Sequence, residues 1–255
     1  MRNDMKRVCT FALGAILGSG IGAYAQQAPG GVTVSEVETQ HNSCTYTISA
    51  AAALKVCISA HGNLYNLISP AGSEHIAGGY GEGYHLCHSG GRYYDLGFGE
   101  EGWNEPIVLF VSSSKVVLER TTTDNRFTLT QTWTRDLVER DATVSNVLRA
   151  NIASTNVLFI RYADVNANGD GIDDAHDYSR FGYSLRDVDA VTGTDTSFSA
   201  DSVWVGSFSG TCGGYLVQPR PQGATGDDWS GVIRYNGGNM AAGTKKTWKV
   251  TYRVQ

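Results

Sequence analysis

Alternation of apolar and polar residues runs through most of this chain and limits the folds that it can adopt. The segment RFTLTQTWT places Phe127, Leu129, Gln131 and Trp133 on one face of an extended chain and threonines on the other. This period of two is typical of a half-buried strand, and the final segment TWKVTYRV repeats it. No window keeps apolar residues at helical spacing for three turns. The pattern therefore predicts an all-β protein.

The strand pattern recurs in segments that are separated by turn residues such as HGN, TTDN and NGG. These further segments are VTVSEVE, NLYNLIS, IVLFVSSSKVVLERTT, NVLFIRYADV, SVWVGSFS and GVIRYN. Many closely spaced strands without helices between them favour antiparallel sheets packed as a β-sandwich, with a closed barrel as the main alternative. A chain of 255 residues can bury one sizeable core, and no linker divides it.

The N-terminus has the order of a secretory signal peptide. Basic residues up to Arg7 precede an apolar run from Val8 to Ile21, and small residues follow at Ala23 and Ala25. We therefore predict a signal peptide over residues 1–25 and one β-sandwich domain over residues 26–255, secreted or periplasmic. An N-terminal buried or anchoring helix is the alternative. No second apolar stretch approaches the ~20 residues of a membrane span, so we expect no span in the mature chain.

Four cysteines remain after removal of the signal peptide, because Cys9 would leave with it. An even number in an exported protein favours disulfides, although four cysteines permit three connectivities. Two of them lie in neighbouring strand-like segments, CTYTISA and LKVCISA, which can face each other across a hairpin. We predict that Cys44 pairs with Cys57 and that Cys87 pairs with Cys212.

The charge distribution argues against a nucleic-acid partner. The formal net charge is -5, and lysine and arginine residues are scattered along the chain. A protein that tracks a phosphate backbone or an anionic membrane surface needs a basic run or patch. We therefore expect neither nucleic acid nor a membrane surface as the ligand.

Four segments of the chain carry a resemblance to known proteins: GEGYHLC, FTLTQTW, LFIRYADVNANG and AAGTKKTWKVTYRV. Their order resembles that of exported bacterial all-β proteins of unknown function, and the strand pattern is similar to that of galactose-mutarotase-like sandwiches. The resemblance covers most of the mature chain and implies a β-sandwich. It transfers no catalytic residue, because it consists of strand patterning.

The segment NANGDGIDDAHD gathers side-chain oxygens at alternating positions and predicts a calcium loop. The ligands in the preferred register are Asn166, Asn168, Asp170, the carbonyl of Ile172, Asp174 and Asp177. Glycine at the sixth position permits the sharp turn that such loops need, and calcium takes about six to eight oxygen ligands. The segment resembles thrombospondin type-3 and dockerin-like calcium loops, although it ends on aspartate rather than glutamate. The alternative is a solvated hairpin, because Asn, Asp and Gly also favour turns.

The segment from Ile76 to Pro106 mixes glycines with aromatic residues and is the candidate ligand site. Exposed aromatic rings beside polar side chains are a common way to hold sugars. We therefore predict a glycan or another cell-surface ligand at Tyr93, Tyr94, Trp103 and Glu82. The alternative is that these rings fill the core beside tight turns.

The same segment supports a second hypothesis, a carbohydrate-active enzyme. Its acidic residues could supply a catalytic carboxylate pair: Glu82, Asp95, Glu100, Glu101 and Glu105. The separation that matters for such a pair is spatial, and a sequence does not give it. Because no catalytic constellation has the support of a motif, the sequence favours a non-enzymatic binding or cell-surface protein.

Overall fold

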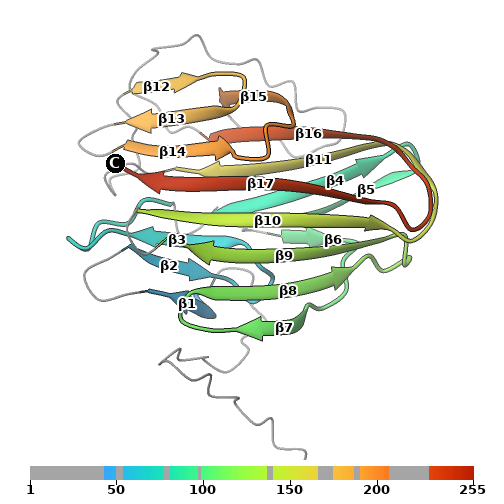
Figure 1. The fold of residues 1–255 in the computed structure, drawn as a ribbon, viewed down its shortest axis with the longest axis horizontal. Coiled ribbons are helices and arrows are strands. Elements are labelled where there is room, and N and C mark those ends of the chain that lie inside the picture. The colour runs from blue at the N-terminus through green and yellow to red at the C-terminus, as the bar shows by residue number, and fades with distance from the viewer. Residues whose placement is uncertain are drawn as a thin grey trace, which may run out of the picture.

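The chain folds into two large antiparallel β-sheets and a small third sheet (Figure 1). The structure is a computed structural model, and it describes residues 43–49, 54–76, 81–96, 99–136, 140–165, 175–186, 190–206 and 230–255. The longest strands of the large sheets run across most of the molecule, and side chains from the two sheets meet in one core. Within the described residues, no helix is long and apolar enough to cross a membrane.

The larger sheet contains eight strands in the order β12-β13-β14-β17-β10-β9-β8-β7. Their bounds are β7 (Ile107–Val111), β8 (Lys115–Thr121), β9 (Phe127–Arg135), β10 (Asp141–Ala150), β12 (Ala175–Tyr178), β13 (Gly182–Arg186), β14 (Ala190–Asp195) and β17 (Lys245–Val254). β7 to β10 are joined by successive hairpins, and β17 enters between β10 and β14. The C-terminal strand therefore lies near the middle of the sheet.

The second large sheet contains six strands in the order β15-β16-β11-β4-β5-β6. Their bounds are β4 (Glu82–His88), β5 (Gly91–Leu96), β6 (Gly99–Glu101), β11 (Ser154–Asp164), β15 (Ala200–Gly206) and β16 (Ser230–Met240). β11 is the central strand, because it pairs with β4 on one side and with β16 on the other. It also follows β10 directly in the chain, so one turn links the middles of the two sheets.

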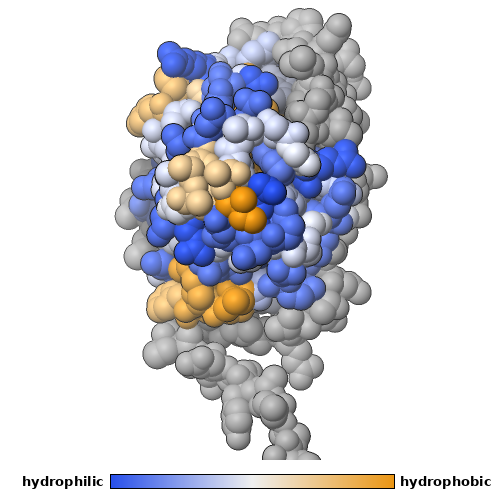
Figure 2. Space-filling view, turned by 90° about the vertical axis from the view of Figure 1, so that its right-hand side faces the viewer, coloured by the Kyte–Doolittle hydropathy of each residue, from blue (hydrophilic) through white to orange (hydrophobic). Residues whose placement is uncertain are grey.

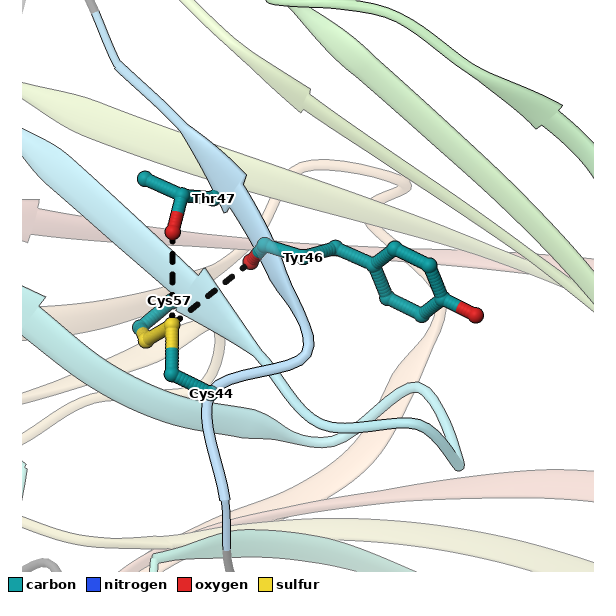
Figure 3. Close-up of a disulfide and its surroundings, with 4 residues drawn as sticks. All are labelled: Cys44, Tyr46, Thr47 and Cys57. Atoms are coloured by element: carbon teal, nitrogen blue, oxygen red, sulfur yellow. Dashed lines mark hydrogen bonds between the residues drawn. A yellow bond between two sulfur atoms is a disulfide. The ribbon is translucent and has the colours of Figure 1, made fainter. Parts of the chain in front are cut away.

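A three-stranded sheet completes the fold with β1 (Tyr46–Ile48), β2 (Lys55–Ile58) and β3 (Leu64–Ile68). A disulfide joins Cys44, just before β1, to Cys57 in β2, with the Cα atoms 5.2 Å apart. Figure 3 shows this disulfide beside Thr47, whose hydroxyl lies 3.4 Å from Cys44 Sγ. The predicted hairpin pairing of these two cysteines is confirmed.

The period-two pattern decides which side chains fill the core. In β9, Phe127, Leu129 and Trp133 are fully buried, whereas the threonines beyond Thr128 are partly exposed. Between the sheets, Phe159 of β11 stacks on Trp248 of β17 with ring centroids 5.2 Å apart. The predicted antiparallel β-sandwich is confirmed.

Candidate functional site

A buried ion pair between Glu82 and Arg161 lies at the centre of the sandwich, and both side chains are inaccessible to solvent. Arg161 Nε donates to Glu82 Oε1, and Arg161 Nη2 donates to Glu82 Oε2 at 2.5 Å. The Tyr252 hydroxyl of the opposite sheet donates to Glu82 Oε1 at 2.7 Å, and the Leu64 amide of the third sheet donates to Oε2 at 3.0 Å. One carboxylate thereby connects all three sheets.

A second buried group surrounds Arg120 of β8. Arg120 Nη1 donates to Asp95 of β5, and Arg120 Nη2 donates to Glu100 of β6 at 2.6 Å. Asn63 Nδ2 donates to the other oxygen of Asp95 at 2.6 Å. These bonds also span the three sheets, because Asn63 directly precedes β3. We call Glu82, Arg161, Asp95, Glu100, Arg120 and His61 the interior ion cluster.

His61 balances the charge of the second group. Its Nδ1 lies 3.3 Å from Asp95 Oδ2 and 3.2 Å from Glu100 Oε2. Burial alone would lower the pKa of His61, but the two carboxylates raise it to about 9. Burial would likewise raise the pKa of Glu100, but its contacts with His61 and Arg120 hold that pKa below the ordinary value. A third carboxylate, that of the exposed Glu105, lies 3.5 Å from His61 Nε2, so the two cations His61 and Arg120 face two enclosed carboxylates and one at the surface.

His61, Asp95 and Glu100 are also the residue types that bind a metal ion, and their ligand atoms lie within 4.8 Å of one another. Arg120, however, already donates to both carboxylates. A divalent ion there would face a buried guanidinium charge at short range, which is costly in a low-dielectric interior. The arrangement therefore fits a salt-bridge cluster better than a metal centre.

An open pocket of about 430 Å³ lies at one end of the sandwich, and we call it the end pocket. Its walls come from three turns and the strands beside them: residues 88–93, Thr123, Asp124, Arg126 and residues 153–155. These turns join β4 to β5, β8 to β9 and β10 to β11, at the right-hand end of Figure 1. Figure 2 faces this end, which is largely hydrophilic around a small apolar patch.

A chain of hydrogen bonds crosses the end pocket. The Tyr93 hydroxyl donates to Asp124 Oδ2 at 2.7 Å and lies 3.3 Å from His88 Nε2. The Gly90 amide donates to His88 Nδ1 at 3.1 Å, so Nδ1 carries no proton and Nε2–H donates to Tyr93. Burial, together with the charge of Arg126, lowers the pKa of His88. His88 is therefore a neutral donor, which is the opposite of His61.

The turn from Thr122 to Arg126 fixes the acidic wall of this pocket. Asn125 has φ 58°, a left-handed conformation that asparagine tolerates better than most residues. Thr122 Oγ1 donates to Asp124 Oδ1 at 2.7 Å and accepts from the Arg126 amide at 2.9 Å. Burial would raise the pKa of Asp124, but the donors from Thr122, Tyr93 and Arg126 lower it. Asp124 is therefore an ionised acceptor at the pocket wall.

The four predicted ligand-binding residues do not converge on one cleft. Glu82 belongs to the interior ion cluster, and Trp103 is 5 % exposed in the hydrophobic core. Tyr93 has its ring in the core, 5.9 Å from that of Trp103, and its hydroxyl in the end pocket. Tyr94 is half-buried against a second hydrophobic cluster and stacks on His85. Only Tyr93 lines the pocket, and a ligand role for the other three stays a prediction.

The calcium prediction falls almost entirely outside the described residues, which include only Asp177 of the six proposed ligands. Asp177 lies in β12, is exposed, and approaches Arg186 to 3.7 Å. Cys87 is disulfide-bonded, and its predicted partner, Cys212, also lies outside the described residues.

Sequence inspection missed the two buried arginines, although their positions contain a signal. Arg120 follows Val116 and Leu118 at the inward positions of β8, and Arg161 follows Phe159 at the inward position of β11. A charged residue that occupies a core position of an alternating strand needs a buried counterion. The end pocket has no comparable signal, because it forms from three turns that are distant in the sequence.

No family model and no curated protein matches the chain in sequence. Solved structures match its fold. A bacterial glucoamylase complexed with acarbose has a TM-score of 0.57 and 9 % identity over 89 % of this chain, which spans about a third (34 %) of that enzyme. A candidate aldose 1-epimerase from Escherichia coli K12 has a TM-score of 0.53 and 10 % identity, over 82 % of this chain and 98 % of the other.

A galactose mutarotase-like protein from Lactobacillus casei ATCC 334 has a TM-score of 0.52 and 12 % identity, over 82 % of this chain and 99 % of its own. At these identities the likeness concerns the fold. The predicted similarity to galactose-mutarotase-like sandwiches is confirmed at that level.

Proposed function

We propose that the protein is an exported carbohydrate-binding β-sandwich that holds a glycan in the end pocket. The observation that carries this proposal is the pocket itself, whose volume falls in the usual range for small-ligand sites. The fold likeness adds support, because the neighbours named above are described as a glucoamylase, an epimerase and a mutarotase-like protein. The disulfide between Cys44 and Cys57 agrees with export.

The chemistry of the pocket wall suits a sugar. Arg92 and Arg126 present guanidinium donors to hydroxyl groups, and Asp124 presents a carboxylate acceptor. Ile152, which is 44 % exposed, directly precedes the third wall segment and offers apolar contact beside these polar groups. A sugar ring combines an apolar face with hydroxyls at its edge, so it can use both kinds of surface.

Binding fits this geometry better than catalysis. Of the carboxylates proposed for an enzyme, Glu82 and Asp95 are fully buried and bonded to arginines. A general acid or base must reach the substrate and exchange its proton with it. Residues that are enclosed in this way serve the stability of the sandwich instead.

Affinity electrophoresis through gels that contain a panel of neutral and acidic polysaccharides tests the proposal. We expect at least one polysaccharide to retard the mature protein and the double variant Arg92→Gln, Asp124→Asn to lose that retardation. Arg234→Gln is the matched control, because Arg234 pairs with Asp201 away from the pocket. Failure of every polysaccharide, or equal retardation of the double variant, would refute binding at this pocket. Release of reducing ends, or mutarotation of a free sugar, would favour the enzyme hypothesis instead.

We also propose that calcium stabilises the loop that contains Asn166 to Asp177. A ligand at one hundred times its dissociation constant stabilises the folded state by about 2.7 kcal/mol. We therefore expect saturating calcium, and magnesium much less, to raise the melting temperature, and Asp170→Ala to abolish the difference. A calorimetric titration without calcium binding would leave the loop as a plain hairpin.

A further inference from the structure

β7 is the terminal strand of the eight-stranded sheet, and it exposes a continuous apolar surface. Four consecutive side chains are between 46 % and 62 % exposed: Ile107, Val108, Leu109 and Phe110. β7 is the lowest strand in Figure 1, and an apolar patch occupies the lower part of the end that faces the viewer in Figure 2. Only Val111, at the end of the strand, packs against the core, whereas the neighbouring β8 alternates between buried and accessible side chains.

Such an edge is unusual, because among the described strands it has no neighbour on its outer side and yet carries exposed apolar side chains. Two local features limit indiscriminate pairing. A β-bulge between Val108 and Phe110 twists the strand, and Lys115 Nζ lies 5.7 Å from the centre of the Phe110 ring. A strand that is shaped in this way favours one specific partner over general aggregation.

We propose that two copies of this chain pair through β7 in antiparallel orientation about a two-fold axis. The charges at the ends of the strand support this orientation. Glu105 precedes β7, and its side chain is 71 % exposed although Oε2 lies 3.5 Å from His61 Nε2 of the same copy. Lys115 is exposed at the other end, since Val111 pairs with Val116. Antiparallel pairing brings Glu105 of each copy to Lys115 of its partner, whereas parallel pairing would place like charges together.

Pairing through β7 would stabilise both copies. It joins the two eight-stranded sheets into one continuous sheet, satisfies the open backbone groups of β7 and shields its apolar residues from water. The contact is isologous, so it closes after two copies instead of propagating into a fibre. It leaves the end pocket open in each copy, because no residue of β7 lines that pocket.

Sedimentation velocity of the mature chain from low to high micromolar concentration tests the proposal. We expect a concentration-dependent dimer, and we expect Phe110→Lys to remain monomeric throughout. Phe198→Lys is the matched control, because Phe198 is 73 % exposed away from β7. A thermal melt of each variant establishes that it is folded.

The charges give a sharper test that does not depend on loss of apolar surface. Glu105→Lys and Lys115→Glu should each weaken dimerisation severalfold, and the double exchange should restore it, because the two charges then meet in reversed order. A wild type that is monomeric at every concentration overturns the proposal, as does a double exchange that stays as weak as its parents. A monomeric wild type that instead binds extended peptides along β7 would assign the edge to a peptide partner.

Discussion

The interior ion cluster and the end pocket use the same residue types for opposite purposes. Both contain a histidine, an arginine and an aspartate. In the interior, His61 contacts two carboxylates, and its pKa rises to about 9 even though burial opposes the change. In the pocket, His88 accepts from the Gly90 amide, and burial with the charge of Arg126 lowers its pKa. The neighbours of a histidine, more than its depth, therefore decide whether it is a fixed cation or a neutral donor.

This contrast separates stability from recognition. The interior charges are bonded to one another across three sheets and, except for the partly exposed Glu100, are almost fully buried, so they stabilise the sandwich. In the end pocket, hydrogen bonds hold the side chains of His88, Tyr93 and Asp124 in position, and the pocket is open to solvent, so a ligand can contact them. Three changes test the distinction.

The largest effect should come from breaking the interior pair at Arg161. Arg161→Met leaves the Glu82 carboxylate buried without its cation, which should cost ~3 to 5 kcal/mol of unfolding free energy in denaturant titrations. The double variant Glu82→Gln, Arg161→Met should recover much of this loss. Arg234→Met, at a partly exposed pair, should cost no more than about 1 kcal/mol. Equal costs for Arg161 and Arg234 would show that the interior cluster has no special role.

The pH dependence of stability should follow His61. Its pKa is about 9 in the folded state and near 6.5 when unfolded. The stabilisation is therefore complete below pH 6.5 and is lost as the pH rises through 9, a change of roughly 3 kcal/mol. His61→Asn should flatten the curve over this window, whereas His88→Asn should not. An unfolding free energy of the wild type that is constant from pH 6.5 to 9 would contradict the charge balance proposed for Asp95 and Glu100.

The smallest effect should come from Tyr93→Phe, which removes the hydroxyl that donates to Asp124 and accepts from His88. Loss of these two hydrogen bonds at the pocket edge should cost about 1 to 2 kcal/mol, since the ring stays in the core. Tyr183→Phe is the control, because the buried Tyr183 hydroxyl has no hydrogen-bond partner in the described part of the chain. That substitution should cost nothing or stabilise. A loss of several kcal/mol at Tyr93 would place it with the interior cluster.

The alternating sequence pattern predicted the sandwich because successive side chains of a strand point to opposite faces of the sheet, so every second residue is buried. Phe127 and Trp133 of β9 and Trp248 of β17 lie in the core for this reason. The disulfide between Cys44 and Cys57 could also be predicted, because the two cysteines lie in neighbouring strand-like segments of the sequence. β10 was not predicted. Its inward face carries Asn146, whose amide oxygen accepts from Arg161 at 2.6 Å, so a polar residue interrupts the apolar pattern.

The site could not be predicted because it depends on long-range geometry. The pocket walls, which come from residues 88–93, from Thr123, Asp124 and Arg126, and from residues 153–155, meet only after three hairpin turns are brought to the same end of the molecule. The segment from Ile76 to Pro106 suggested a ligand cleft because it is rich in glycine and aromatic residues, but Trp103 lies in the core. Composition indicates which groups are present, whereas strand order decides which of them face solvent.

The most direct test of the central claim is an NMR titration of the isotope-labelled mature protein with an oligosaccharide from the polysaccharide that retards it. If the end pocket binds the glycan, the largest amide shifts will fall in residues 88–93, 123–126 and 153–155, and the amides of His61 and Asp95 will stay in place. Shifts that concentrate instead around His61 and residues 99–105 would contradict the account and make the interior ion cluster the ligand site.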